Sequence, residues 1–141
     1  MPFNQPINDD ILVTVEAPTG AGTSTITSTP VDMAGFTGAL FIVRLGTPDA
    51  TNNIRAQEDT TVGMGAAADL QGTLVTSGAN NVVVLQVLNP GKQFFRCSVT
   101  RPVSSTIDSI TTIRFGARVK PTTWPGTISF ESWNYSPEGT A

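Results

Sequence analysis

The sequence contains no histidine, and this absence removes the most common acid–base catalyst and metal ligand among the side chains. Serine and cysteine triads built on histidine are therefore excluded. The single cysteine, Cys97, cannot form an internal disulfide or a redox pair, and one thiolate with carboxylates makes a poor zinc site. We expect no enzymatic activity, no metal and no cofactor. Two distant carboxylates brought together by the fold, as in glycoside hydrolysis, are the catalytic arrangement that the sequence leaves open.

Two further motifs carry little chemistry. Adjacent acids occur at Asp9–Asp10 and at Glu58–Asp59, and neither pair has the spacing of a known calcium-binding loop, so we interpret both as solvated turn carboxylates. The segment GMGAAAD (63–69) resembles a dinucleotide-binding glycine motif but follows no hydrophobic strand. We expect a flexible loop there, with a turn of helix.

Charged residues are scarce. They make up 13% of the chain, about half of the ~25% that is typical of soluble domains. The net charge is −3 and the six arginines are scattered, so no basic stripe is available for nucleic acid. The 21 threonines favour half-exposed strand positions. Such a surface suits a protein that lies against another protein, although an ordinary β domain with a neutral surface is equally compatible with it.

Long apolar runs are also missing. The run Ala39–Val43 contains five apolar residues, whereas a membrane helix needs about 20, so no membrane span is predicted. We expect this run to form a strand covered on both faces. The first ten residues contain no Lys or Arg and no apolar stretch, so neither a secretory signal nor a transit peptide is expected.

Short apolar stretches with period-two alternation recur along the chain, separated by turn residues. This pattern predicts an all-β fold: a single antiparallel β-sandwich, a jelly roll or a small barrel, with strand order left open. The expected divisions of the chain are an N-terminal arm (1–10), a β domain (11–135) and a C-terminal tail (136–141).

Alternation also assigns residues to the core. In FFRCSVTR (94–101) we expect Cys97 inside, as a small core residue rather than a nucleophile. In TTIRFGARVKP (111–121) we expect Ile113 and Phe115 inside and Arg114 outside. The predicted core residues are Val13, Phe41, Val43, Leu85, Phe95, Val99, Ile113, Phe115, Ile128 and Phe130.

The order of segments resembles a known family. VDMAGF runs into an aliphatic strand, followed by DLQGT, a Val-rich strand ending in Pro, FFRCSVTR, DSITTIRFGARVKP and a terminal SPEGTA. Together these segments, from about residue 11 to Ala141, are similar to the capsid decoration, or cement, proteins encoded among the head genes of tailed bacteriophages. The resemblance would place an arginine where Phe94 stands, so no role is carried over to that position. It implies an all-β structural virion protein, made in the host bacterial cytoplasm, on the outer surface of the head.

The resemblance also implies partners. It predicts binding to the major capsid protein and bridging of its subunits, without nucleic acid or membrane. The low-charge surface suggests a homo-oligomer, with a trimer expected and a dimer as the second choice. The N-terminal segment reads as an arm stiffened by Pro2 and Pro6, with disordered termini as the alternative. A tail-fibre or receptor-binding module that stacks sugars on its aromatic residues is the alternative function. Predicted interface residues are Phe3, Ile7, Trp124, Trp133 and Tyr135.

Overall fold

The structure, a computed structural model, describes residues 10–119. Within this range the chain forms strands joined by turns and no helix, so no helix there is long and apolar enough to cross a membrane. The strands are β1 (Leu12–Val15), β2 (Thr19–Gly22), β3 (Ile26–Thr27), β4 (Val31–Asp32), β5 (Gly38–Thr47), β6 (Asn53–Asp59), β7 (Ala68–Asp69), β8 (Val75–Thr76), β9 (Val82–Leu88), β10 (Phe94–Thr100) and β11 (Ser105–Phe115).

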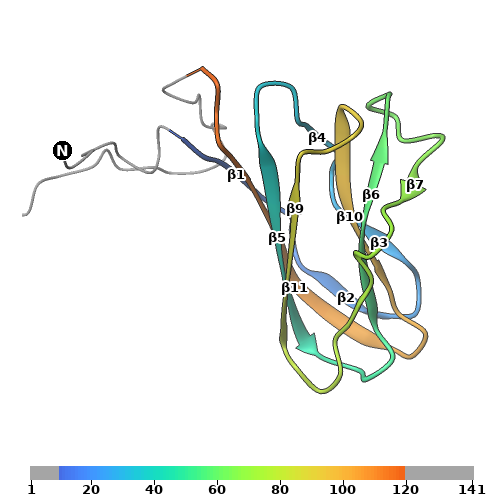
Figure 1. Cartoon of the computed structure of the whole chain (residues 1–141). Helices are drawn as coiled ribbons and strands as arrows, with labels where there is room; N and C mark the ends of the chain where they lie inside the picture. The colour runs from blue at the N-terminus through green and yellow to red at the C-terminus, as the bar shows by residue number, and fades with distance from the viewer. Residues whose placement is uncertain (1–9, 120–141) are drawn as a thin grey trace, which may run out of the picture.

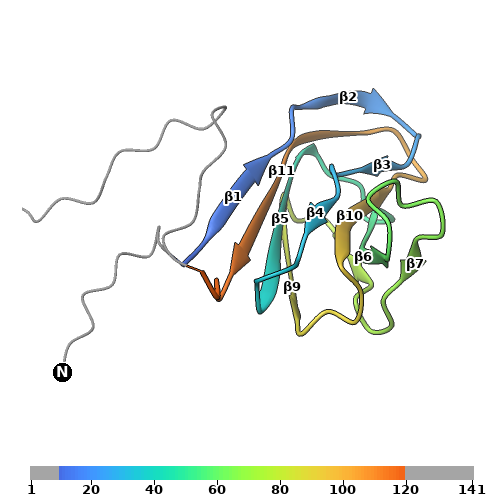
Figure 2. The ribbon, with the colours of Figure 1, turned by 90° about the horizontal axis from the view of Figure 1, so that it is seen from above.

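These strands form two antiparallel sheets. Sheet A has the order β1-β11-β5-β9, with β2 also paired to β11. Sheet B has the order β3-β10-β6-β7, with β4 paired to β10 and β8 to β6. The two sheets pack face to face and do not close into a barrel (Figures 1 and 2). The fold is therefore a β-sandwich, one of the three architectures that the sequence predicted.

The core lies between the sheets, where alternation predicted it for the central strands. Phe41 on β5 and Phe95 on β10 are fully buried, and Leu85 on β9 is 7% exposed. Predicted core residues Val43 and Val99 are also buried, while Ile128 and Phe130 lie outside the described residues.

The interpretation of Cys97 as a small core residue is confirmed. Its side chain is fully buried in the apolar cluster between the sheets. Burial disfavours the thiolate and raises the pKa of this thiol to about 12. Cys97 is therefore a packing residue with an inert thiol.

The predicted inward face of β11 is wrong. Register shifts near Thr106 and Ser109 set the alternation so that Ile110 and Thr112 point into the core, with 1% and 2% exposure. Ile113 and Phe115 lie on the opposite, outer face and are half-buried. Val13 was also assigned to the core, but it pairs with Ile113 and shares the outer face.

Arg114 is correspondingly not an outward residue. It is half-buried near one end of the sandwich, where its guanidinium lies 5.1 Å from the centre of the Phe36 ring. Its Nη1 donates to the backbone oxygen of Asp32 at 2.9 Å. Burial lowers the pKa of Arg114, and the nearby Asp32 carboxylate opposes that shift. The alternation of charged and apolar residues in this segment therefore indicated a strand but did not show which of its faces meets the core.

The helical turn predicted near residues 63–69 does not form, and Asp59 explains why. Its Oδ2 accepts a hydrogen bond from the Ala66 N–H at 2.9 Å and its Oδ1 accepts one from the Thr60 N–H at 2.6 Å. Met64 turns the loop with a positive φ of 53° and is 4% exposed. Asp59 itself is 2% exposed, so the interpretation of this residue as a solvated turn carboxylate is wrong.

Asp59 should make stability depend on acid pH. The backbone N–H of Ala66, with those of Thr60 and Thr61, holds the pKa of this carboxyl below its ordinary value of 3.8. A carboxyl whose pKa is depressed by folding stabilises the folded state above its unfolded pKa, and this stabilisation is lost as the pH falls through the folded pKa. We expect Asp59→Asn to lower the thermal midpoint at pH 7 and to weaken the decline below about pH 4. Asp108→Asn, at an exposed carboxylate, is the control, and an equal effect of both substitutions would contradict this role of Asp59.

Candidate interaction surface

The outer face of sheet A is apolar. On β1, β5, β9 and the C-terminal part of β11, the residues that alternate with the core residues are mostly aliphatic or aromatic. They also stand beside one another across the strands: Val13 pairs with Ile113, which pairs with Leu40, and Val84 pairs with Ile42. Such neighbours have Cβ atoms about 5 Å apart, so they are in contact. Two polar residues stand in the same rows: Thr111 lies between Val15 and Ile42, and Gln86 lies beside Leu40. The residues of this apolar face are Val13, Val15, Leu40, Ile42, Val82, Val84, Leu88, Ile113 and Phe115.

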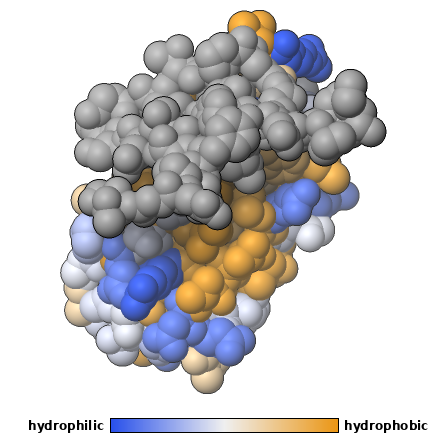
Figure 3. Space-filling view, turned by 90° about the vertical axis from the view of Figure 1, so that its left-hand side faces the viewer, coloured by the Kyte–Doolittle hydropathy of each residue, from blue (hydrophilic) through white to orange (hydrophobic). Residues whose placement is uncertain are grey.

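Much of this apolar face is open to solvent. Val15, Val84 and Leu88 are each more than half exposed, while Leu40 and Ile42 are half-buried among their neighbours. The prediction that the run from 39 to 43 is covered on both faces is confirmed for the inner face, where alternate residues are fully buried, while on the outer face Leu40 and Ile42 are covered in part. Figure 3 looks onto this side of the molecule and shows a hydrophobic area in the part of the face that is visible, with polar side chains on either side of it.

The size of the apolar face is at the level of an interaction site. Strands spaced by ~4.8 Å, with about seven residues each on β5, β9 and β11 and four on β1 at ~3.3 Å per residue, project an area of roughly 400 Å². Apolar patches of about 300–600 Å² are the largest that typical monomers expose, and they are often functional. At its margin, Arg44 and Asp108 form an exposed ion pair with a 3.4 Å separation between Nε and Oδ2.

The outer face of sheet B has the opposite character. Arg55 and Gln57 on β6 donate hydrogen bonds to the Asp69 carboxylate on β7. Gln57 in turn accepts a hydrogen bond from Arg96 on β10, with 2.8 Å between Nε and Oε1. The bonds from Gln57 and Arg55 lower the pKa of Asp69, so this network is charged at neutral pH. The sandwich therefore has one polar outer face and one apolar outer face.

Both ends of the described chain lie at one corner of sheet A. Leu12, which begins β1, pairs with Arg114 near the end of β11, and the Ala117 N–H donates to the Asp10 carbonyl at 3.3 Å. Segments 1–9 and 120–141 therefore both begin beside the apolar face.

The predicted interface residues Phe3, Ile7, Trp124, Trp133 and Tyr135 all lie outside the described residues. The apolar face was missed as a site because some of its members were assigned to the core. One signal was available in the sequence. VVVLQVL is apolar at nearly every position, and Val82, Val84 and Leu88 follow an alternation opposite to that of the core residues. A strand that is apolar on both faces needs cover on both.

The cavities of the described residues offer no stronger site. A hollow of about 280 Å³ contains two acids, Glu16 and Asp32, beside Arg114, but both carboxylates already accept hydrogen bonds from backbone N–H groups. A hollow of about 460 Å³ lies between the loops around residues 33–37 and 89–93, and neither a carboxylate nor a thiol lines it. Among residues 10–119, no three Cys, Asp or Glu side chains gather in an arrangement that could hold a metal ion. The apolar face is thus the strongest candidate for function within this range.

Comparison with known proteins adds no identification. No protein-family model matches the chain, and no curated protein sequence matches it.

Proposed function

We propose that this protein is a capsid decoration protein, which binds the outer surface of the mature phage head and bridges neighbouring major capsid subunits. The observation that carries the proposal is the contrast between the two outer faces of the sandwich. A module fixed to a protein shell needs a face that loses its water on binding and a face that stays hydrated. Sheet A provides the first of these and sheet B the second.

The position of the chain ends supports bridging. Asp10 and Ala117, near the two ends of the described range, are hydrogen-bonded to each other at one corner of the apolar face. We propose that the chain before and after them contacts a second subunit while the face is seated on the first. Extended segments bind efficiently by adding a strand to an exposed sheet edge. Each bridge makes its second contact effectively intramolecular, so weak individual contacts sum to strong binding. The segment order that resembles decoration proteins points to the same function.

The proposal predicts selective binding to the expanded head. A ligand stabilises one lattice state only through its differential affinity for that state, and subunit spacing differs between the immature and the expanded shell. The test is to pellet purified protein with undecorated mature heads and with proheads, then to heat the decorated heads. We expect at least tenfold tighter binding to mature heads and DNA release at a higher temperature than from bare heads.

A pair of variants ties this binding to the apolar face. Val15→Lys places a charge in the middle row of the face, at a side chain that is 55% exposed. Val62→Lys makes the same change in a loop next to sheet B, at a side chain that is 62% exposed. We expect Val15→Lys to weaken head binding at least tenfold and Val62→Lys to leave it unchanged. Equal binding to both shells, or equal release temperatures with and without the protein, would refute this function and favour a tail-fibre or receptor-binding module.

A further inference from the structure

Strand edges in the described part of the chain differ in how well they are protected against pairing with another chain. Native proteins shield edges by short strands, prolines, bulges and charges. β3, β4, β7 and β8 contain two residues each, and β2 is Gly-rich with a register shift beside it. β1 has four residues and is soon followed by Pro18. Each of these edges therefore carries at least one protective feature.

β9 carries none of them. It is seven residues long, contains no proline, glycine or charge, and pairs with β5 without a register shift. It lies at the edge of sheet A and pairs with no other strand in the described range. Figure 2 shows it at the opposite edge from β1. By the rules that govern sheet edges, β9 is a template for an additional strand.

The hydrogen bonds to β5 show which backbone groups of β9 face outward. The Leu45 N–H donates to the Asn81 carbonyl, and the Asn89 N–H donates to the Thr37 carbonyl. Because hydrogen-bonded pairs alternate in an antiparallel ladder, the odd-numbered residues of β9 bond to β5. The backbone groups of the even-numbered residues therefore point away from β5. These residues are Val82, Val84, Gln86 and Leu88, and all four are exposed.

We propose that β9 pairs with β9 of a second copy of this chain, antiparallel and across a two-fold axis at Leu85. Val84 then lies opposite Gln86 of the partner subunit, and Val82 lies opposite Leu88 of the partner subunit. All four outward-facing residues form hydrogen-bonded pairs, about eight bonds in total. The contact is isologous, so it closes as a dimer and does not propagate.

A second copy fits this edge for two reasons. First, β9 contains no charge, so two copies meet without electrostatic repulsion. Second, the pairing joins the two apolar faces into one, which raises the projected area from roughly 400 to roughly 800 Å², near the area that each partner contributes to a standard interface. The sequence suggested an oligomer with a trimer first, and the edge of β9 favours the dimer.

Cysteine cross-linking tests the strand register. In a hydrogen-bonded antiparallel pair the Cα atoms are about 5.5 Å apart, within disulfide range, whereas diagonal positions are about 7–8 Å apart and outside it. Val84→Cys and Gln86→Cys variants should therefore cross-link efficiently when mixed under mild oxidation. Each variant alone should cross-link at least fivefold less. The native Cys97 is buried with a raised pKa, so it does not compete.

Sedimentation of the full chain tests the dimer itself. We expect the wild-type protein to sediment as a dimer at tens of micromolar. Val84→Lys should sediment as a monomer with an unchanged circular dichroism spectrum. Val15→Lys, at a similarly exposed side chain on the opposite edge strand, should remain a dimer.

Three outcomes would overturn the proposal: a monomeric wild type, loss of the dimer in both lysine variants, or cross-linking of Val84→Cys alone that equals that of the mixture. A monomeric wild type would mean that β9 does not pair with a second copy of itself. Loss of the dimer in both lysine variants would indicate that the apolar faces pair face to face. Equal cross-linking of Val84→Cys alone would indicate a shifted strand register. None of these results depends on phage heads. Failure of the dimer is therefore distinguishable from failure of the proposed function.

Discussion

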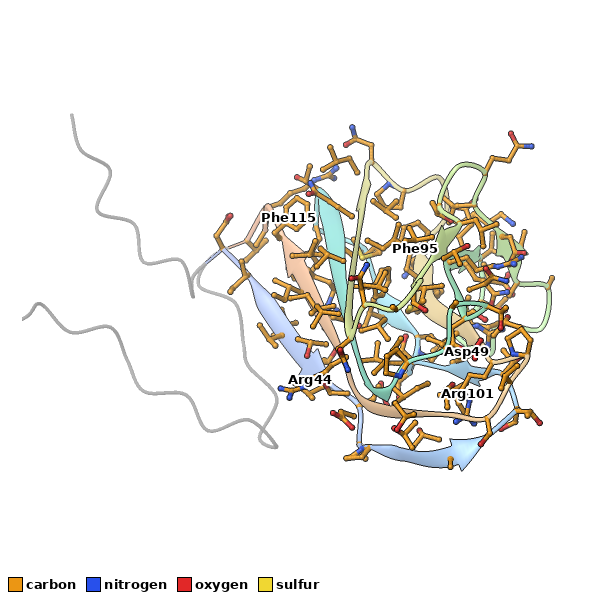
Figure 4. All side chains as sticks on the ribbon, turned by 90° about the horizontal axis from the view of Figure 1, so that it is seen from below. Arg44, Asp49, Phe95, Arg101 and Phe115 are labelled. Carbon is orange, nitrogen blue, oxygen red and sulfur yellow. The ribbon has the colours of Figure 1, made fainter. Side chains whose placement is uncertain are left out.

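Replacing Arg101 with methionine is expected to lower the free energy of unfolding by about 3 kcal/mol. Arg101 is 2% exposed, and it follows β10 at the end of the sandwich where β2 turns toward β3 (Figure 4). Its Nη1 donates to the Gly20 carbonyl at 2.9 Å and to the Ser105 carbonyl at 2.6 Å, and its Nε donates to the Ser24 carbonyl at 2.9 Å. One side chain thus ties the β2–β3 connection to the start of β11.

Two opposing effects determine the size of this loss. Hydrogen bonds from a charged donor contribute about 1.5–3 kcal/mol each, and methionine removes the donors of three carbonyl groups at once. Removing a buried charge also relieves a desolvation penalty of several kcal/mol, which offsets part of the loss. Methionine has a similar length and leaves little cavity, so the remaining difference reports mainly on the carbonyl groups.

Urea denaturation measures the effect, and hydrogen exchange locates it. Exchange of the amides in β2 and β3 should accelerate more than exchange of those in β9. Arg101→Lys is the control, because the lysine ammonium keeps the charge and can still donate to some of these carbonyl groups, so it should lose less than methionine. Unchanged stability in the methionine variant would contradict the role of Arg101 as a tie between the sheets.

The period-two pattern predicted correctly which face of β9 and of β10 is buried. In β9 and β10 the predicted inner residues, such as Leu85 and Phe95, are buried. In β11 the same pattern, applied to residues 111–121, overlapped the last five residues of the strand and assigned the wrong face. Alternation shows that one face of a strand is apolar, and it does not show whether that face meets the core or a partner. Ile113 and Phe115 were misassigned for this reason.

Long-range contacts explain what the sequence could not predict. Arg101 bonds to backbone carbonyls that lie 77 and 81 residues away, and carbonyl groups leave no signature in a sequence. Asp59 is satisfied by the backbone N–H groups of its own loop, so its burial also has no side-chain signal. The apolar face did have a signal in the sequence, since β9 is apolar on both sides. The role of β9 as an exposed edge became visible only from the order of the strands in sheet A.

The core between the sheets and the outer face of sheet A predict different costs for the same substitution. Phe95 lies between the sheets and is fully buried, whereas Phe115 lies on the outer face, half-buried and paired with Gly38 on β5 (Figure 4). Phe95→Ala opens a cavity in the core, so we expect it to lower the free energy of unfolding by about 4 kcal/mol. Phe115→Ala removes a ring that already contacts water, so about 1 kcal/mol is expected.

The same pair of variants separates folding from binding. A single domain has a total stability of about 5–15 kcal/mol, so Phe95→Ala leaves a marginal fold whose head binding should be unchanged at any temperature where the variant is still folded. Phe115→Ala should leave the protein folded and still weaken head binding, because the ring belongs to the apolar face. Denaturation in urea followed by the pelleting assay at a temperature where both variants are folded measures both effects. Equal destabilisation by the two substitutions would mean that Phe115 is as well packed as a core residue. Unaltered head binding by Phe115→Ala would mean that the end of sheet A around Phe115 does not contact the shell.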